Sequence, residues 1–172
     1  MIMSEDKTYS ALFLCTGNSA RSILGEAILN RLGAGRFKAY SAGSNPAGAV
    51  NPFAIALLEE RGYPVDGLRS KSWEEFAGPD APDIDFVFTV CDSAGEETCP
   101  VWPGHPVTAH WGIPDPAAVG GTDDEKRAAF ETAYDALRAR IDMFLNLKLD
   151  TDDTAALRRQ LGEIGRAFPQ SA

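Results

Sequence analysis

Long hydrophobic runs are absent from this sequence, and this absence excludes a membrane-spanning protein. No apolar stretch among the 172 residues approaches the roughly 18 residues that a membrane-spanning helix needs. The N-terminal residues, MIMSEDKTYS, contain neither the basic block nor the apolar block of a secretory signal peptide. We therefore expect a cytoplasmic protein with no membrane partner.

Positive charge is also scarce. The chain has 16 lysine and arginine residues and 25 acidic residues, so its formal net charge is −9. A surface that binds nucleic acid is normally basic, so we expect no nucleic-acid partner. An anionic small molecule is not excluded in the same way, because a local group of backbone N–H donors can bind an anion inside an acidic protein.

Cysteine is rare, with only Cys15, Cys91 and Cys99 in the chain. An odd number of cysteines without an export signal argues against a static disulfide framework and leaves redox chemistry, metal binding or spare thiols. Zinc bound by Cys91, Cys99 and either His105 or His110 is one alternative, but a Cys-x7-Cys pair with single histidines is not a usual zinc spacing. We expect neither a metal nor a cofactor.

The apolar pattern predicts four short strands that alternate with helices. The strand candidates are residues 11–14, 36–40, 85–90 and 106–111. The run at 85–90 is almost continuously β-prone, as expected of a strand that is covered on both faces. Such alternation predicts an α/β fold, with a parallel sheet and helices on both of its faces.

Two helices of the N-terminal half have clear boundary signals. Residues 21–32 carry apolar side chains at helical spacing, and Gly33 marks the end. Asn51 is a good N-cap, and Pro52 follows at the first helical position. The side chains expected to form the buried stripe of this second helix are Phe53, Ala56 and Leu57.

Further helix starts lie in the C-terminal half. Ser72 fits a capping box with Glu75 three residues later. A long helix is expected from Asp123, with a core-facing stripe of Phe130, Tyr134, Leu137, Ile141, Phe144 and Leu145. The tail suggests one more amphipathic helix, capped near Thr151 or Asp152, which could pack on the body or on a partner. Its apolar positions are Ala156, Leu157, Leu161 and Ile164.

The segment 11–22 combines a strand end, a loop of small residues and a helix start. Cys15 follows the apolar run, and Arg21 opens the helix. Five small residues between them can wrap a tetrahedral oxyanion in backbone N–H groups at a helix N-terminus. The positive field there should lower the pKa of Cys15 below the value of about 8.5 for a free thiol. An inert core thiol is the alternative.

Cys91 and Asp115 also follow the ends of predicted strands. The carboxyl ends of parallel strands meet at one edge of a sheet, so we expect both residues to lie near Cys15. Asp115, which lies between Pro114 and Pro116, is the candidate general acid that protonates a departing oxygen. A loop aspartate that only caps a turn is the alternative.

The sequence CTGNSARS at 15–22 resembles the signature loop of the low-molecular-weight protein tyrosine phosphatase family, which includes thiol-dependent arsenate reductases. The other matching motifs are YSAG at 40–43, VNPFAI at 50–55, FTVCD at 88–92 and HWGIPDP at 110–116. The resemblance implies a three-layer fold whose four-stranded parallel sheet has the order 2-1-3-4. The resemblance covers about residues 9–148, so we expect a reductase domain over 1–148, followed by a helical extension over 149–172 that lies beyond the resemblance.

The same resemblance assigns roles within the loop. The oxyanion-binding residues would be Thr16, Gly17, Asn18, Ser19, Ala20, Arg21 and Ser22. Asn18 would brace the loop, the Ser22 hydroxyl would stabilise the thiolate, and Asp115 would be the general acid. Arg21 would bind oxyanion oxygens through its planar, bidentate guanidinium.

The extra thiols distinguish the two branches of this family. Reduction of arsenate must draw two electrons from thiols, whereas a phosphatase needs only the loop cysteine. By resemblance, Cys15 attacks arsenate, Cys91 attacks the adduct, and Cys99 then forms an exposed disulfide with Cys91. Thioredoxin, or glutathione with glutaredoxin, would regenerate the thiols, and phosphate or sulfate would compete with arsenate.

Two other functions stay open from the sequence. The first is a phosphatase of phosphotyrosine or small phosphoesters that uses Cys15, Arg21 and Asp115. Against it, Ala117 and Ala118 stand where dedicated phosphatases commonly carry aromatic residues. The second is a non-catalytic protein that responds to oxyanions or to redox state.

Overall fold

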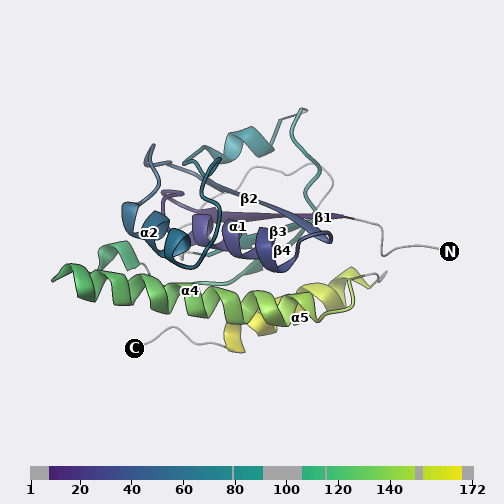
Figure 1. Cartoon of the computed structure of the whole chain (residues 1–172). Helices are drawn as coiled ribbons and strands as arrows, with labels where there is room; N and C mark the ends of the chain where they lie inside the picture. The colour runs from purple at the N-terminus through teal and green to yellow at the C-terminus, as the bar shows by residue number, and fades with distance from the viewer. Residues whose placement is uncertain (1–7, 79, 91–105, 115, 150–152, 168–172) are drawn as a thin grey trace.

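The computed structural model describes residues 8–78, 80–90, 106–114, 116–149 and 153–167, and structural statements below concern these residues. The described part forms a β-sheet with helices packed along it (Figure 1). No helix within these ranges has the length and apolar character needed to cross a membrane.

The sheet has four parallel strands: β1 (Tyr9–Cys15), β2 (Phe37–Gly43), β3 (Phe86–Thr89) and β4 (Val107–His110). Their order is β2-β1-β3-β4, so the predicted order 2-1-3-4 is confirmed. Strand β2 is longer than predicted, because it pairs with β1 as far as Cys15 opposite Gly43. The residues Ser41 to Gly43 have turn-like composition, and only pairing with β1 makes them a strand.

The helices are α1 (Arg21–Leu32), α2 (Pro52–Glu60), α4 (Asp123–Leu145) and α5 (Thr154–Ala167). Asn51 caps α2 by accepting a hydrogen bond from the Phe53 N–H. Thr122 and Glu125 form a capping box that starts α4. The stripe predicted for α2 is partly wrong: Leu57 is buried, but Ala56 is exposed and Ala54 and Leu58 are buried instead.

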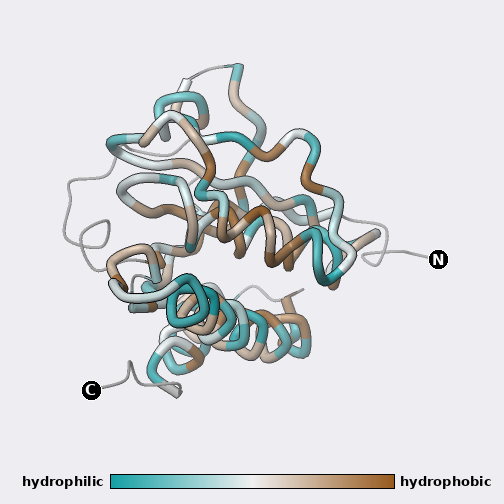
Figure 2. Tube along the Cα trace, turned by 60° about the vertical axis from the view of Figure 1, so that its left-hand side comes forward, coloured by the Kyte–Doolittle hydropathy of each residue, from teal (hydrophilic) through white to brown (hydrophobic). Residues whose placement is uncertain are grey.

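One face of the sheet carries the larger core. Helices α1 and α4 pack against each other there, and α5 lies beside α4 and contacts β4 (Figure 1). Aromatic rings fill the space between, and Phe88 stacks on Trp111 with 3.9 Å between ring centroids. In Figure 2 the strands and α1 carry most of the hydrophobic colour, whereas the outer turns of α4 are hydrophilic. Burial of this aromatic layer positions the strand ends that carry the candidate site.

The opposite face is covered differently from the prediction. A helix with a capping box was expected from Ser72, but the structure has a four-residue 3-10 helix, η2 (Trp73–Phe76). Ser72 accepts from the Glu74 N–H, and the Glu75 carboxylate pairs with Arg69 instead of reaching back to Ser72. The second half of the capping box is therefore missing. Phe76 packs into the smaller core formed on this face by Leu12, Leu14, Ala42, Ile84 and Val87.

The tail contains helix α5, which packs on the body of the protein. The Ala156 N–H donates to the Asp153 carboxylate at 2.9 Å, while the caps expected at Thr151 or Asp152 lie outside the described residues. The indole N–H of Trp111 donates to the Leu161 carbonyl at 2.9 Å, so α5 is joined to the end of β4. The division into a domain over 1–148 and an extension over 149–172 stays a prediction.

Candidate active site

The loop between β1 and α1 joins Cys15 to the N-terminus of a helix. Cys15 ends β1 and is 4% exposed, and Arg21 begins α1. The N-cap of α1 is Ala20, which has no side chain able to accept a hydrogen bond, and no side chain caps this helix. The first-turn N–H groups of a helix lack intrahelical partners, so an uncapped N-terminus is suited to bind an anion.

The carbonyl groups of the loop are bonded to a neighbouring segment, 45–51. The N–H groups of Asn45, Ala47 and Asn51 donate to the carbonyls of Thr16, Gly17 and Ser19 at 2.9, 2.9 and 2.8 Å. These carbonyl oxygens, which would repel an anion, are therefore directed at that segment. Such an arrangement favours a loop interior lined by N–H groups.

Asn18 fixes the conformation of the loop. Its backbone has φ of +46°, and it alone among the described non-glycine residues has a positive φ. The side chain is fully buried, its Oδ1 accepts from the Lys71 N–H at 2.8 Å, and its Nδ2 donates to Ser22 Oγ at 2.8 Å. Because the Ser22 oxygen accepts this bond, its hydroxyl proton can be donated elsewhere, as stabilising a thiolate requires.

Arg21 links the loop to a distant part of the chain. Its Nη1 donates to the Ile113 carbonyl at 2.9 Å, across 92 positions of sequence. Ile113 is buried and lies two residues before Asp115. Asp115 itself lies outside the described residues, but the segment that leads to it is joined to the guanidinium of Arg21. The predicted nearness of Asp115 to the loop therefore stays a prediction.

Cys91 and Cys99 also lie outside the described residues. The residue before Cys91, Val90, is fully buried, and its N–H donates to the Leu14 carbonyl at 2.9 Å. Leu14 precedes Cys15. The described segment that precedes Cys91 therefore ends beside β1, the strand that carries Cys15, and the position of Cys91 relative to Cys15 stays a prediction.

Sequence reasoning missed one residue near the loop, Lys71. Its side chain is buried, and Nζ lies 3.8 Å from the Glu26 carboxylate and 3.4 Å from Ser41 Oγ. Burial lowers the pKa of Lys71 and raises the pKa of Glu26. No local pattern in the polar sequence around Lys71 predicts its burial, because its partners come from α1 and β2.

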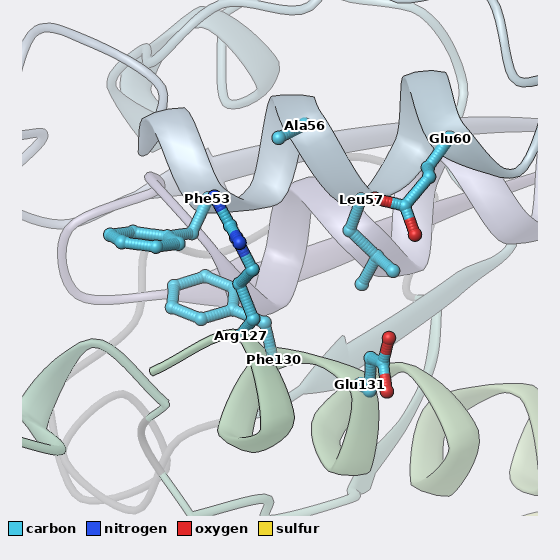
Figure 3. A pocket seen from close by; sticks show the side chains of 7 residues that line it. All are labelled: Phe53, Ala56, Leu57, Glu60, Arg127, Phe130 and Glu131. Atoms are coloured by element: carbon cyan, nitrogen blue, oxygen red, sulfur yellow. The ribbon is translucent and has the colours of Figure 1, made fainter. Parts of the chain in front are cut away.

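A small pocket of about 50 Å³ lies between α2 and α4 (Figure 3). Phe53 of α2 stacks on Phe130 of α4 with 5.7 Å between ring centroids, and Glu60 and Glu131 lie on either side of the gap. None of the predicted site residues lines it. This pocket is therefore separate from the oxyanion loop.

The family model described as "Low molecular weight phosphotyrosine protein phosphatase" matches residues 10–160 of this chain. The match includes the Cys15 loop, the sheet from Ser10 onward and the whole of α4. The chain belongs to this phosphatase family. Membership confirms the resemblance inferred from the sequence motifs, although the roles of individual site residues stay predictions.

Relatives within the phosphatase family are named arsenate reductases. One from Bacillus licheniformis is 36% identical over 143 residues, which cover 83% of this chain and 96% of the relative. A glutaredoxin arsenate reductase from Synechocystis is 30% identical over 131 residues, which cover 76% and 92%. The solved structure of an arsenate reductase in the phosphate binding state matches with a TM-score of 0.61 at 28% identity, covering 78% of this chain and 98% of that one.

Proposed function

We propose that this chain is an arsenate reductase in which Cys15 is the nucleophile. The observation that carries the proposal is the loop between β1 and α1, where five residues separate a buried cysteine from Arg21 at an uncapped helix N-terminus. Similarity to named arsenate reductases over most of their length supports the choice of arsenate as substrate.

In the first step the Cys15 thiolate attacks arsenic and forms an S–As bond. One oxygen of arsenate leaves with a proton from Asp115, as water or hydroxide. Arsenic stays in the As(V) state at this stage. The helix N-terminus and the Arg21 guanidinium would stabilise the negative charge of the oxyanion throughout.

In the second step the Cys91 thiolate attacks the sulfur of Cys15. A Cys15–Cys91 disulfide forms, the S–As bond breaks, and its electron pair stays on arsenic, which leaves as arsenite. Cys99 then attacks Cys91, forms the Cys91–Cys99 disulfide and frees Cys15. An external thiol reductant, thioredoxin or glutathione with glutaredoxin, supplies the two electrons that restore the thiols. We expect this cycle to run in the cytoplasm.

A thiol count with disulfide mapping tests the relay. Fully reduced protein is incubated with arsenate and no external reductant, and its thiols are counted before and after. The expected result is a loss of two thiols, with Cys91–Cys99 as the mapped disulfide. Survival of all three thiols would contradict the intramolecular relay, and repeating the incubation with glutathione would then separate a glutathione-dependent reductase from a phosphatase.

Phosphoester hydrolysis is the second candidate function, because the family is described as phosphotyrosine phosphatases and the Cys15 loop is common to both reactions. Two variants separate the two activities. Cys15→Ser should abolish both, since both need the nucleophile. Cys91→Ser should abolish arsenate reduction and spare phosphoester cleavage. Equal loss of both activities in Cys91→Ser would count against the relay.

A further inference from the structure

Lys71 is a buried charged residue that the proposed chemistry does not use. It is 8% exposed, and its main-chain N–H donates to Asn18 of the oxyanion loop. Its Nζ donates to the carbonyl of Arg69 at 2.7 Å and to Ser41 Oγ at 3.4 Å, and the Glu26 carboxylate lies 3.8 Å away. Ser41 in turn donates to the same Glu26 oxygen at 2.5 Å. Burying an ammonium group is unfavourable unless it is paired and hydrogen-bonded. The oxygens of Arg69, Ser41 and Glu26 therefore stabilise the buried charge of Lys71.

The three partners of the ammonium come from three different parts of the fold. Glu26 is in α1, the helix whose N-terminus forms the candidate anion site, and Ser41 is in β2. The Arg69 carbonyl belongs to the 69–72 segment, which carries Lys71 itself. The side chain of Lys71 therefore fastens the 69–72 segment to both α1 and β2.

The 69–72 segment holds the oxyanion loop through main-chain groups and through the Ser70 hydroxyl. The Lys71 N–H donates to Asn18 Oδ1, the Lys71 carbonyl accepts from the Gly43 N–H at 2.9 Å, and the Ser70 hydroxyl donates to the Gly17 carbonyl at 3.2 Å. Asn18 has a positive φ, a conformation that persists in a non-glycine residue only when surrounding contacts impose it. The Lys71 N–H supplies one of those contacts.

We propose that Lys71 is a positioning residue for the oxyanion loop, because its buried ammonium holds the 69–72 segment against Glu26 and Ser41 and the segment in turn holds Asn18. The inference rests on the proposed function, since it assigns Lys71 a part in the same oxyanion site. It extends that function by making oxyanion affinity depend on an ion pair that the oxyanion does not touch.

The test compares Lys71→Met with Arg69→Met in fully reduced, full-length protein. Methionine keeps an unbranched apolar side chain and removes the charge. Arg69 is the matched control, because it lies in the same segment, its side chain is 59% exposed, and its carbonyl is unaffected by the change. Two quantities are measured: the Kd for inorganic phosphate by calorimetry, and the rate at which iodoacetamide alkylates Cys15 across a pH series, read by mass spectrometry of the Cys15 peptide.

Lys71→Met should weaken phosphate binding about tenfold or more, as expected when a preorganised site is displaced by a fraction of an ångström. It should also move the alkylation profile of Cys15 to higher pH, because a relaxed loop stabilises the thiolate less. Arg69→Met should match the wild type in both measurements. Unchanged phosphate affinity in a folded Lys71→Met protein would overturn the proposal.

The double variant Lys71→Met with Glu26→Gln separates positioning from simple charge balance. It removes the buried carboxylate that Lys71→Met would leave unpaired, so it should regain stability. If the single variant does not fold, the double variant is compared with the wild type in its place. Phosphate binding should stay weak in it. Recovery of affinity together with stability would mean that Lys71 only balances Glu26, against the proposal. If the wild-type protein binds no phosphate, the result would contradict the oxyanion site itself and therefore the proposed function.

Discussion

Gly43→Ala is the substitution that tests most directly how the oxyanion loop is packed. Gly43 ends β2 and lies against the loop. A Cβ atom at this position would overlap the main-chain oxygen of Thr16 and would lie 2.8 Å from the main-chain oxygen of Cys15 and 3.0 Å from Cβ of Asn18. Two of these atoms are backbone, which cannot rotate away as a side chain can. The loop must therefore move for alanine to fit.

The size of the effect follows from this overlap. Overpacking of a close contact lowers the free energy of unfolding by about 1–3 kcal/mol. A displacement of the loop by about 1 Å should reduce catalytic efficiency about 100-fold, because the anion donors and the thiol would no longer be aligned. The effect of Gly43→Ala on activity should thus exceed what the loss of folded protein explains.

The assays are urea denaturation, phosphate calorimetry and arsenate-dependent thiol loss, each on reduced protein. Gly78→Ala is the matched control, because a Cβ atom at Gly78 would meet no heavy atom within 4 Å. Its stability and phosphate affinity should equal those of the wild type. A Gly43→Ala protein that binds phosphate as tightly as the wild type would refute the reasoning, since the loop would then tolerate displacement.

Three further substitutions test other contacts. Arg21→Lys should raise the Kd for phosphate by about 10-fold or more, measured by calorimetry, because lysine cannot form the planar bidentate contact; equal affinity would contradict this role. Burial and the hydrogen bond with Tyr134 raise the pKa of Tyr63 to about 12, so the stability that this group contributes is present below pH about 10 and lost as pH rises toward 12. Tyr63→Phe should flatten that alkaline decline in denaturation experiments, and a decline of unchanged slope would argue against the assignment. Trp111→Phe removes the indole donor to the Leu161 carbonyl and should lower the free energy of unfolding by about 2 kcal/mol in urea denaturation; a smaller loss than about 0.5 kcal/mol would mean that α5 is held by other contacts.

Local sequence signals predicted the parts of the fold that are decided locally. Asn51 and Pro52 start α2 as expected, and Gly33 follows the end of α1. The local signal at Ser72 failed because a residue outside the motif competes for Glu75. The Glu75 carboxylate forms an ion pair with Arg69, so the capping box at Ser72 does not close.

One part of the candidate site could be predicted from the sequence, and another part could not. The order of residues from Cys15 to Arg21, between an apolar run and a helical pattern, indicated a loop for an oxyanion without any structure. The support of that loop could not be predicted, because it comes from residues far away in sequence. Lys71 is 53 positions from Asn18, and Ile113 is 92 positions from Arg21.

The sequence by itself therefore determined the alternation of strands and helices, the family, and the loop that begins at Cys15, because each depends on neighbouring residues or on a contiguous motif. Only the tertiary structure decided that Lys71 is buried against Glu26, that Gly43 lies against the loop, and that the Arg21 guanidinium bonds to the segment before Asp115. These contacts form only when the parallel strands align at one edge of the sheet, since the ends of separate strands then meet in space.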